Sequence, residues 1–165
     1  MRSKLGFLIS MLCAVGGCGS GSNEDSGKEK NVNTFVGVWS ATSGTTTTTC
    51  PGQGPSVDQV TDPETWAAGS TSDLVQTLLG SSCVFHANIT ATTATGVAGQ
   101  SCTITTTESG DSVTEVINFS SYTFSLSADH ATANENFSGT VVITNNTAGN
   151  TVNCAFTQTA SYSKQ

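Results

Sequence analysis

Alternation of apolar and polar residues dominates the second half of the chain. The clearest runs place an apolar or small residue at every second position in 83–89, 122–126, 137–143 and 152–156. Successive side chains of a strand point to opposite sides, so these runs predict strands with one buried face. The abundance of Val and Thr favours the same structure, because β-branched residues fit a pleated surface. The sequence predicts strands near 34–41, 45–50, 83–91, 97–107, 112–119, 121–127, 136–145 and 151–162.

Turn-forming residues separate the predicted strands. Ser109-Gly110-Asp111 and Asn145-Asn146 have the residue types that turns favour. Short strands at close spacing predict an all-β domain over 34–165, an antiparallel meander closed as a barrel or folded as a sandwich, with about 7–8 strands.

One segment, 51–82, lacks the alternation. Within it, Ser72 is a helix-capping residue type and Gly80 a helix stop, which predicts a short helix from Asp73 to Leu79. Its apolar stripe would be Leu74, Val75, Leu78 and Leu79. We expect a loop-and-helix insertion that covers a barrel end or a sheet edge, or that acts as a lid over a cavity.

The N-terminus has the order of a secretory signal. Arg2 and Lys4 precede an apolar stretch, Leu5–Val15, which is too short to span a bilayer. The sequence Val15-Gly16-Gly17-Cys18 resembles the lipobox of bacterial lipoproteins. The resemblance implies a signal peptide over 1–17, cleavage before Cys18, a diacylglyceryl group on its sulfur and an acylated amino terminus. Ordinary secretion, with cleavage near Gly16, is the alternative.

Residues 18–33 are rich in Gly, Ser and Asn and have no apolar period. We expect a flexible linker that holds the folded domain away from the membrane. Gly19 follows the cysteine, where an Asp retains Gram-negative lipoproteins at the inner membrane. The resemblance therefore implies the outer membrane.

Four cysteines lie in the β domain, and an even number in an exported chain predicts two disulfides. Cys83 and Cys102 are equidistant from a turn near residues 92–93 and would face each other in a hairpin. That leaves Cys50 with Cys154, joining an early strand to the last one, as a closed barrel requires. The other two pairings stay open.

The charge of the domain excludes one class of partner. Nine of the 12 Asp and Glu residues follow residue 33, whereas Lys164 is the only Lys or Arg there. Nucleic-acid binding requires cations that neutralise phosphates, so no nucleic-acid partner is expected. Adhesion of the domain to an anionic membrane surface is excluded for the same reason.

Gly37-Val38-Trp39 resembles the Gly-x-Trp motif that opens lipocalins, eight-stranded barrels that hold small apolar ligands. In that family a basic side chain from a late strand covers the Trp. The resemblance implies an interior cavity, for which we expect as lining residues Trp39, Phe85, Ile89, Phe124, Val141 and Phe156. The domain is also similar to bacterial β-rich lipoproteins with Thr-rich strands and cysteine-bearing hairpins such as Gly99-Gln100-Ser101-Cys102, a resemblance that implies a fold and no activity.

Catalytic and metal-binding patterns are absent from the sequence. His86 takes an outward strand position and His130 follows Asp129 in an expected loop, and neither has a nucleophile motif beside it. No spacing of ligands indicates zinc, and Asp58, Asp62 and Glu64 lack the spacing of a calcium loop. We therefore expect no metal, cofactor or catalytic residue.

These observations favour a lipid-anchored, disulfide-stapled envelope lipoprotein that is a non-catalytic binding or structural module. A lipocalin-like carrier of a small apolar ligand is the alternative, and a hydrolase is a third and weaker one. The expected partners are the membrane, through Cys18, and a small apolar ligand or an envelope protein.

Overall fold

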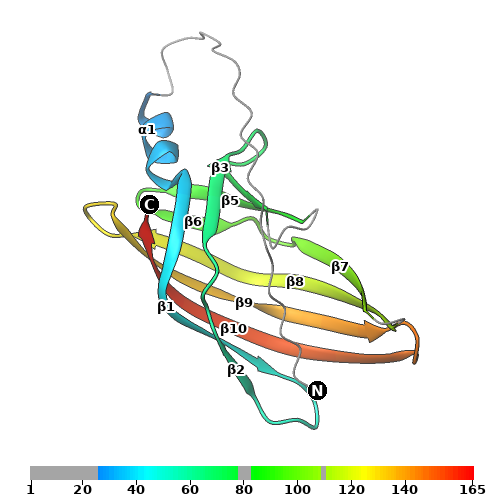
Figure 1. Ribbon diagram of the computed structural model, residues 1–165. Helices are drawn as coiled ribbons and strands as arrows, with labels where there is room; N and C mark the ends of the chain where they lie inside the picture. The colour runs from blue at the N-terminus through cyan, green and yellow to red at the C-terminus, as the bar shows by residue number, and fades with distance from the viewer. Residues whose placement is uncertain (1–25, 78–82, 109–110) are drawn as a thin grey trace.

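The structure, a computed structural model, describes residues 26–77, 83–108 and 111–165 (Figure 1). The expected signal peptide and Cys18 lie outside these residues. Within the described part there are one helix and ten strands. They are α1 (Ser26–Phe35), β1 (Gly37–Thr49), β2 (Ser56–Gln59), β3 (Glu64–Ala68), β4 (Leu74–Thr77), β5 (Val84–Thr90), β6 (Thr93–Gly96), β7 (Ser101–Glu108), β8 (Asp111–Leu126), β9 (Thr132–Asn145) and β10 (Asn150–Lys164).

All strand pairs are antiparallel, and most neighbours in sequence are neighbours in space. The order β1-β3-β4-β5-β6-β8-β9-β10 closes on itself, because β10 pairs with β1. The predicted antiparallel meander is therefore confirmed, but the described residues form ten strands where about 7–8 were expected, and the meander forms a ring of strands rather than a regular barrel or a sandwich. Strands β2 and β7 lie outside this ring.

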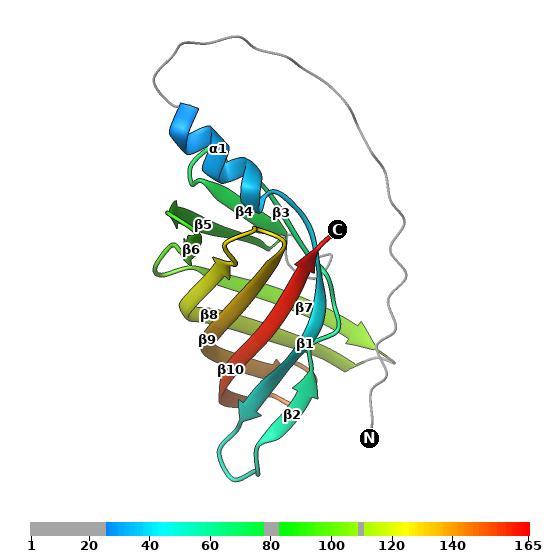
Figure 2. The same cartoon turned by 90° about the vertical axis from the view of Figure 1, so that its left-hand side faces the viewer.

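The long strands continue beyond the ring. Residues 37–39 of β1 pair with β3, whereas residues 45–48 pair with β2. Likewise, residues 123–125 of β8 pair with β6, whereas residues 111–118 pair with β7. The result is an open curved layer that we call the sheet extension (Figures 1 and 2). It consists of β2, β7, residues 45–49 of β1, 111–119 of β8, 138–145 of β9 and 150–158 of β10.

Two pairs of predicted strands are single strands in the structure. The first pair is joined in β1, where the register shifts between Ala41 and Ser43 against β10. The second pair is joined in β8, where the register shifts between Phe119 and Ser121 against β9. A bulge adds one residue while the strand continues, so it breaks the alternation in sequence without ending the strand.

The helix predicted at 73–79 is wrong over its described part. Residues 74–77 form β4, which pairs with β3 and β5 on its two sides. Leu74 and Gln76 are buried, so the segment has the period of two that a strand requires. Hydrogen bonds from β4 to β3 and to β5 stabilise the strand more than the capping residue and the stop residue favour a helix. The rest of the predicted helix, from residue 78, lies outside the described residues.

The segment expected as a linker differs as well, because residues 26–35 form α1. Phe35 is fully buried, and Val32 and Val36 pack partly buried against the same core. This spacing of three and four residues places all three side chains on one helix face. The helix therefore packs onto the ring at the end where β10 finishes (Figure 1).

Both predicted disulfides are confirmed. Cys50 bonds to Cys154 and Cys83 bonds to Cys102. The first joins the end of β1 to β10 in the sheet extension. The second joins the residue before β5 to β7, and so ties the ring to the extension.

Candidate functional site

A pair of carboxyl groups lies inside the ring. Glu64 begins β3, and Glu135 on β9 is only 2% exposed. Their side chains share a hydrogen bond. The Tyr162 hydroxyl lies 2.7 Å from Glu135 Oε2 and 3.2 Å from Glu64 Oε1. Tyr122 donates to Glu64 Oε2 over 3.3 Å.

Amide and indole groups complete this cluster. Gln158 Nε2 donates to Glu135 Oε1 at 3.0 Å, and Thr46 donates to Gln158 Oε1 at 2.6 Å. On the other side, Gln76 bonds to Glu64, and Trp66 Nε1 donates to it at 3.3 Å. Within the described residues, no buried side-chain nitrogen or oxygen lacks a partner.

Burial keeps a proton in the pair. Burial and the adjacent negative charge of Glu64 raise the pKa of Glu135 to about 8. Burial also raises the pKa of Glu64 and of Tyr162, so Tyr162 stays a donor. The arrangement can hold one proton between two carboxyls. It does not resemble the carboxyl pair of a glycosidase, whose two groups stand about 5 Å or more apart.

Sequence reasoning missed this pair, although a signal for Glu135 exists. The alternation of β9 runs through Ala133, Glu135 and Phe137, so Glu135 stands at an inward position. Glu64 had no such signal, because its strand lies in the segment that was expected to be a loop.

The six residues expected to line a cavity lie in two regions. Trp39, Phe85 and Phe124 are fully buried in the ring, where Trp39 contacts Phe124 with ring centroids 5.2 Å apart. Phe85 contacts Tyr122 at 4.8 Å, so these rings pack on one another. Ile89 packs partly buried against the same core. The remaining two, Val141 and Phe156, lie in the sheet extension and are half-buried.

The Trp39 ring is covered by a basic side chain. Lys164, on the last strand, places Nζ 5.3 Å from the centroid of the Trp39 ring. The same Nζ donates to the carbonyl oxygen of Thr34 at 2.6 Å, at the C-terminal end of α1. Burial lowers the pKa of Lys164.

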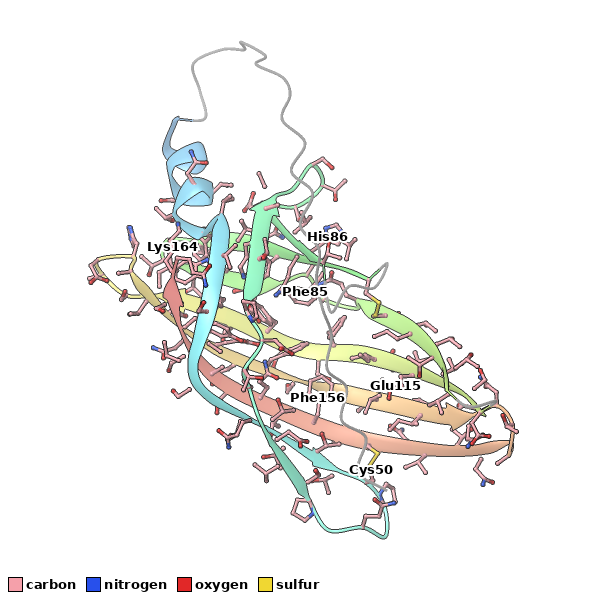
Figure 3. All side chains as sticks on the ribbon, viewed as in Figure 1. Cys50, Phe85, His86, Glu115, Phe156 and Lys164 are labelled. Atoms are coloured by element: carbon pink, nitrogen blue, oxygen red, sulfur yellow. A yellow bond between two sulfur atoms is a disulfide. The ribbon has the colours of Figure 1, made fainter. Side chains whose placement is uncertain are left out.

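The face of the sheet extension that continues the ring interior is mostly apolar. We call it the inner face. Its residues occupy the same alternate positions of β8, β9 and β10 as the residues buried in the ring. No described helix or strand is stacked on it (Figures 1 and 2). The inner face carries Cys102, Ile104, Val113, Glu115, Ile117, Val141, Ile143, Val152, Cys154 and Phe156, with Thr106 and Asp111 toward its outer end. Cys102 and Cys154 are buried, Val152 is 37% exposed, and Thr106 and Asp111 are exposed; the others are half-buried. Figure 3 labels Glu115 and Phe156 over this layer and Phe85 within the ring.

The two histidines take no catalytic arrangement. His86 Nδ1 lies 3.0 Å from the Ser72 hydroxyl, which donates its proton to the carbonyl oxygen of Leu74 at 2.8 Å. Nδ1 must then be the donor, which is the reverse of what activation of a serine requires. His130 lies in the turn between β8 and β9 with a φ of 57°.

The acidic residues considered for calcium do not gather. Asp58 and Asp62 are exposed, whereas Glu64 points into the ring. Among the described residues, no group of three or more His, Cys, Asp or Glu side chains is placed to hold a metal ion. In the same part of the chain, no helix has the length and apolar character needed to cross a membrane.

Comparison with known proteins identifies no relative: no family model, no curated protein and no solved structure matches this chain.

Proposed function

We propose that this protein is an exported lipoprotein, anchored through Cys18 to the outer membrane, that acts as a non-catalytic binding module. The inner face of the sheet extension is its binding surface. One observation carries this proposal: the long strands extend the core pattern beyond the ring, and the apolar face that results has no second layer of described elements over it. Exposed apolar surface of this kind is characteristic of interaction sites.

If the protein is instead a carrier of a small apolar ligand, the inner face is also the place where that ligand would bind. A ligand in the ring would have to displace Trp39, Phe85 and Phe124, which contact other rings of the core. Val141 and Phe156 are available without such a rearrangement, because they are half-buried in the extension. A small apolar ligand would therefore bind on the inner face.

Two neighbouring valines provide a matched test of this surface. Val141 lies on the inner face and Val142 on the outer face of β9, and both are half-buried. The probe is N-phenyl-1-naphthylamine, a neutral apolar dye that fluoresces when it leaves water. We expect the full chain to raise its fluorescence, Val141→Asn to reduce the effect several-fold, and Val142→Asn to retain it. Equal effects of both substitutions, or no dye binding by the unaltered chain, would contradict the proposed surface.

The anchor is tested separately. We expect Cys18→Ala to move the protein from the membrane fraction to the soluble fraction, because the acyl chains supply the membrane affinity. A Cys18→Ala protein that stays with the membrane would show that another feature anchors the chain.

A further inference from the structure

On the inner face, one acidic side chain, Glu115, stands among apolar residues; Asp111, at the same parity, is exposed at the start of β8. The partners of Glu115 across β7 and β9 are Ile104 and Ile143, whose Cβ atoms lie about 5 Å away in such pairs. Val113 and Ile117 precede and follow it on the same face of β8, each about 7 Å away along the strand. A single carboxylate therefore stands in the middle of an apolar surface.

Glu115 has no partner among the described residues, since no hydrogen bond or ion pair there engages its carboxylate. In the ring, by contrast, the inward carboxylate of Glu135 is bound by Tyr162 and Gln158. Lys164, the only Lys or Arg after residue 33, is held over Trp39 at the far end of β10. The protein itself therefore supplies no cation to Glu115 from its β domain.

We propose that the inner face binds an amphiphilic cation, with the apolar body on the Ile and Val side chains and an amine on Glu115. The inference rests on the proposed function and deepens it. An apolar ligand that covers this face removes water from the carboxylate, which is unfavourable unless a charge partner replaces the water. A ligand amine provides that partner and a charge-assisted hydrogen bond.

The overall charge supports a cationic ligand over the other occupants. The chain has a formal net charge of −7, which attracts cations and repels anions. A second copy on the same face would bring two uncompensated Glu115 side chains and two acidic domains together. Four neighbouring strands, β7 to β10, give the face a width of about 14 Å, which suits a medium-length alkyl chain.

The experiment compares three probes with one tail: decylammonium, decanol and decyl sulfate, each below its micelle-forming concentration. Isothermal titration uses the full chain with Cys18→Ala, so that acyl groups do not compete. We expect decylammonium to bind about tenfold more tightly than decanol, the effect of one hydrogen bond to a charged group, and decyl sulfate to bind most weakly. The preference for decylammonium should fall as salt is added.

The decisive variant is Glu115→Gln, with Asp62→Asn as the control that removes one exposed charge away from the inner face. We expect Glu115→Gln to abolish the preference for the cation and to leave decanol binding intact, and Asp62→Asn to change neither. Equal binding of decylammonium and decanol by the unaltered face overturns the charge inference while the apolar surface stands. A preference that survives Glu115→Gln also overturns it.

Two further outcomes would test the whole inner face as a binding surface, and not Glu115 alone. If none of the three probes binds, the proposed function fails together with this inference. If no probe binds and the chain self-associates in a way that Val141→Asn abolishes, the inner face is occupied by a second copy, and the ligand inference is overturned. If Glu115→Gln does not fold, the comparison of decylammonium with decanol on the unaltered face still tests whether the bound ligand is preferred as a cation, and equal binding overturns the inference.

Discussion

The protonated carboxyl pair in the ring gives the folded state an unusual dependence on pH. The ordinary pKa of 4.5 is what Glu135 has in the unfolded chain, whereas in the ring it is about 8. Between these two values the folded protein holds more protons than the unfolded one. The free energy of unfolding therefore falls as pH rises through this window. The whole difference, at about 1.36 kcal/mol per pH unit, is on the order of 5 kcal/mol.

The change that isolates this effect is Glu135→Gln. A glutamine keeps an oxygen that can accept from Gln158 and an NH₂ that can donate to Glu64, but it cannot lose a proton. Urea unfolding of the oxidised protein at pH 5.5 and pH 7.5 measures the result. We expect the free energy of unfolding of the unaltered protein to fall by roughly 2–3 kcal/mol across this interval, for one proton. Glu135→Gln should remove most of that decrease.

The control for this measurement is Asn136→Gln, a change to the neighbouring outward residue that adds no titratable group. It should keep the slope of the unaltered protein. An unaltered protein whose stability is constant or rises between pH 5.5 and 7.5 would refute the reasoning. So would a Glu135→Gln variant that retains the slope.

Two other predictions concern the disulfides and the packing of the long strands. Replacing Cys50 and Cys154 by Ser should lower the free energy of unfolding more than replacing Cys83 and Cys102. The first disulfide joins residues 104 apart and the second joins residues 19 apart. On the chain-entropy model, the expected losses are about 4.7 kcal/mol for the first and about 3 kcal/mol for the second. Urea titrations of the two double variants measure this order, and equal losses would contradict it. Gly139→Val should cost about 1–3 kcal/mol by overpacking, because a Cβ at this position would clash with the backbone carbonyl oxygen of Asn118 and lie 2.9 Å from the Phe156 ring. A variant with unchanged thermal unfolding would show that the neighbouring strand and the ring both move aside.

Alternation predicts the strands well where each strand has one buried side. The runs through Phe85, Phe137 and Phe156 lie in β5, β9 and β10 as expected. A break in the alternation does not distinguish the end of a strand from a bulge within it. At residues 42 and 120 a bulge changes the parity without ending β1 or β8, so each was predicted as two strands. Short strands such as β4 have too few residues to show a period, and their pairing partners decide their structure.

The candidate sites were predictable only in part, for a related reason. Polar residues at inward positions mark both sites, as Glu135, Gln158 and Glu115 each stand between apolar residues of one face. That pattern indicates that a polar group points inward. It does not show whether the group finds a partner, because the partner of Glu135 comes from β3, far away in the sequence. The same sequence pattern therefore occurs at Glu135, whose carboxyl group has hydrogen-bond partners in the ring, and at Glu115, whose carboxylate has none among the described residues of the extension.

The positions of the disulfides explain how an open layer is kept beside a closed ring. The ring buries its aromatic residues on all sides, but the extension buries only part of one face and gains less from the hydrophobic effect. Both disulfides have a cysteine on the inner face of the extension, Cys102 on β7 and Cys154 on β10. One bond joins β10 to the end of β1 within the layer, and the other joins β7, at the edge of the layer, to the residue before β5 in the ring. Reduction should therefore loosen the extension before the ring, so that the proposed binding surface depends on an oxidising compartment.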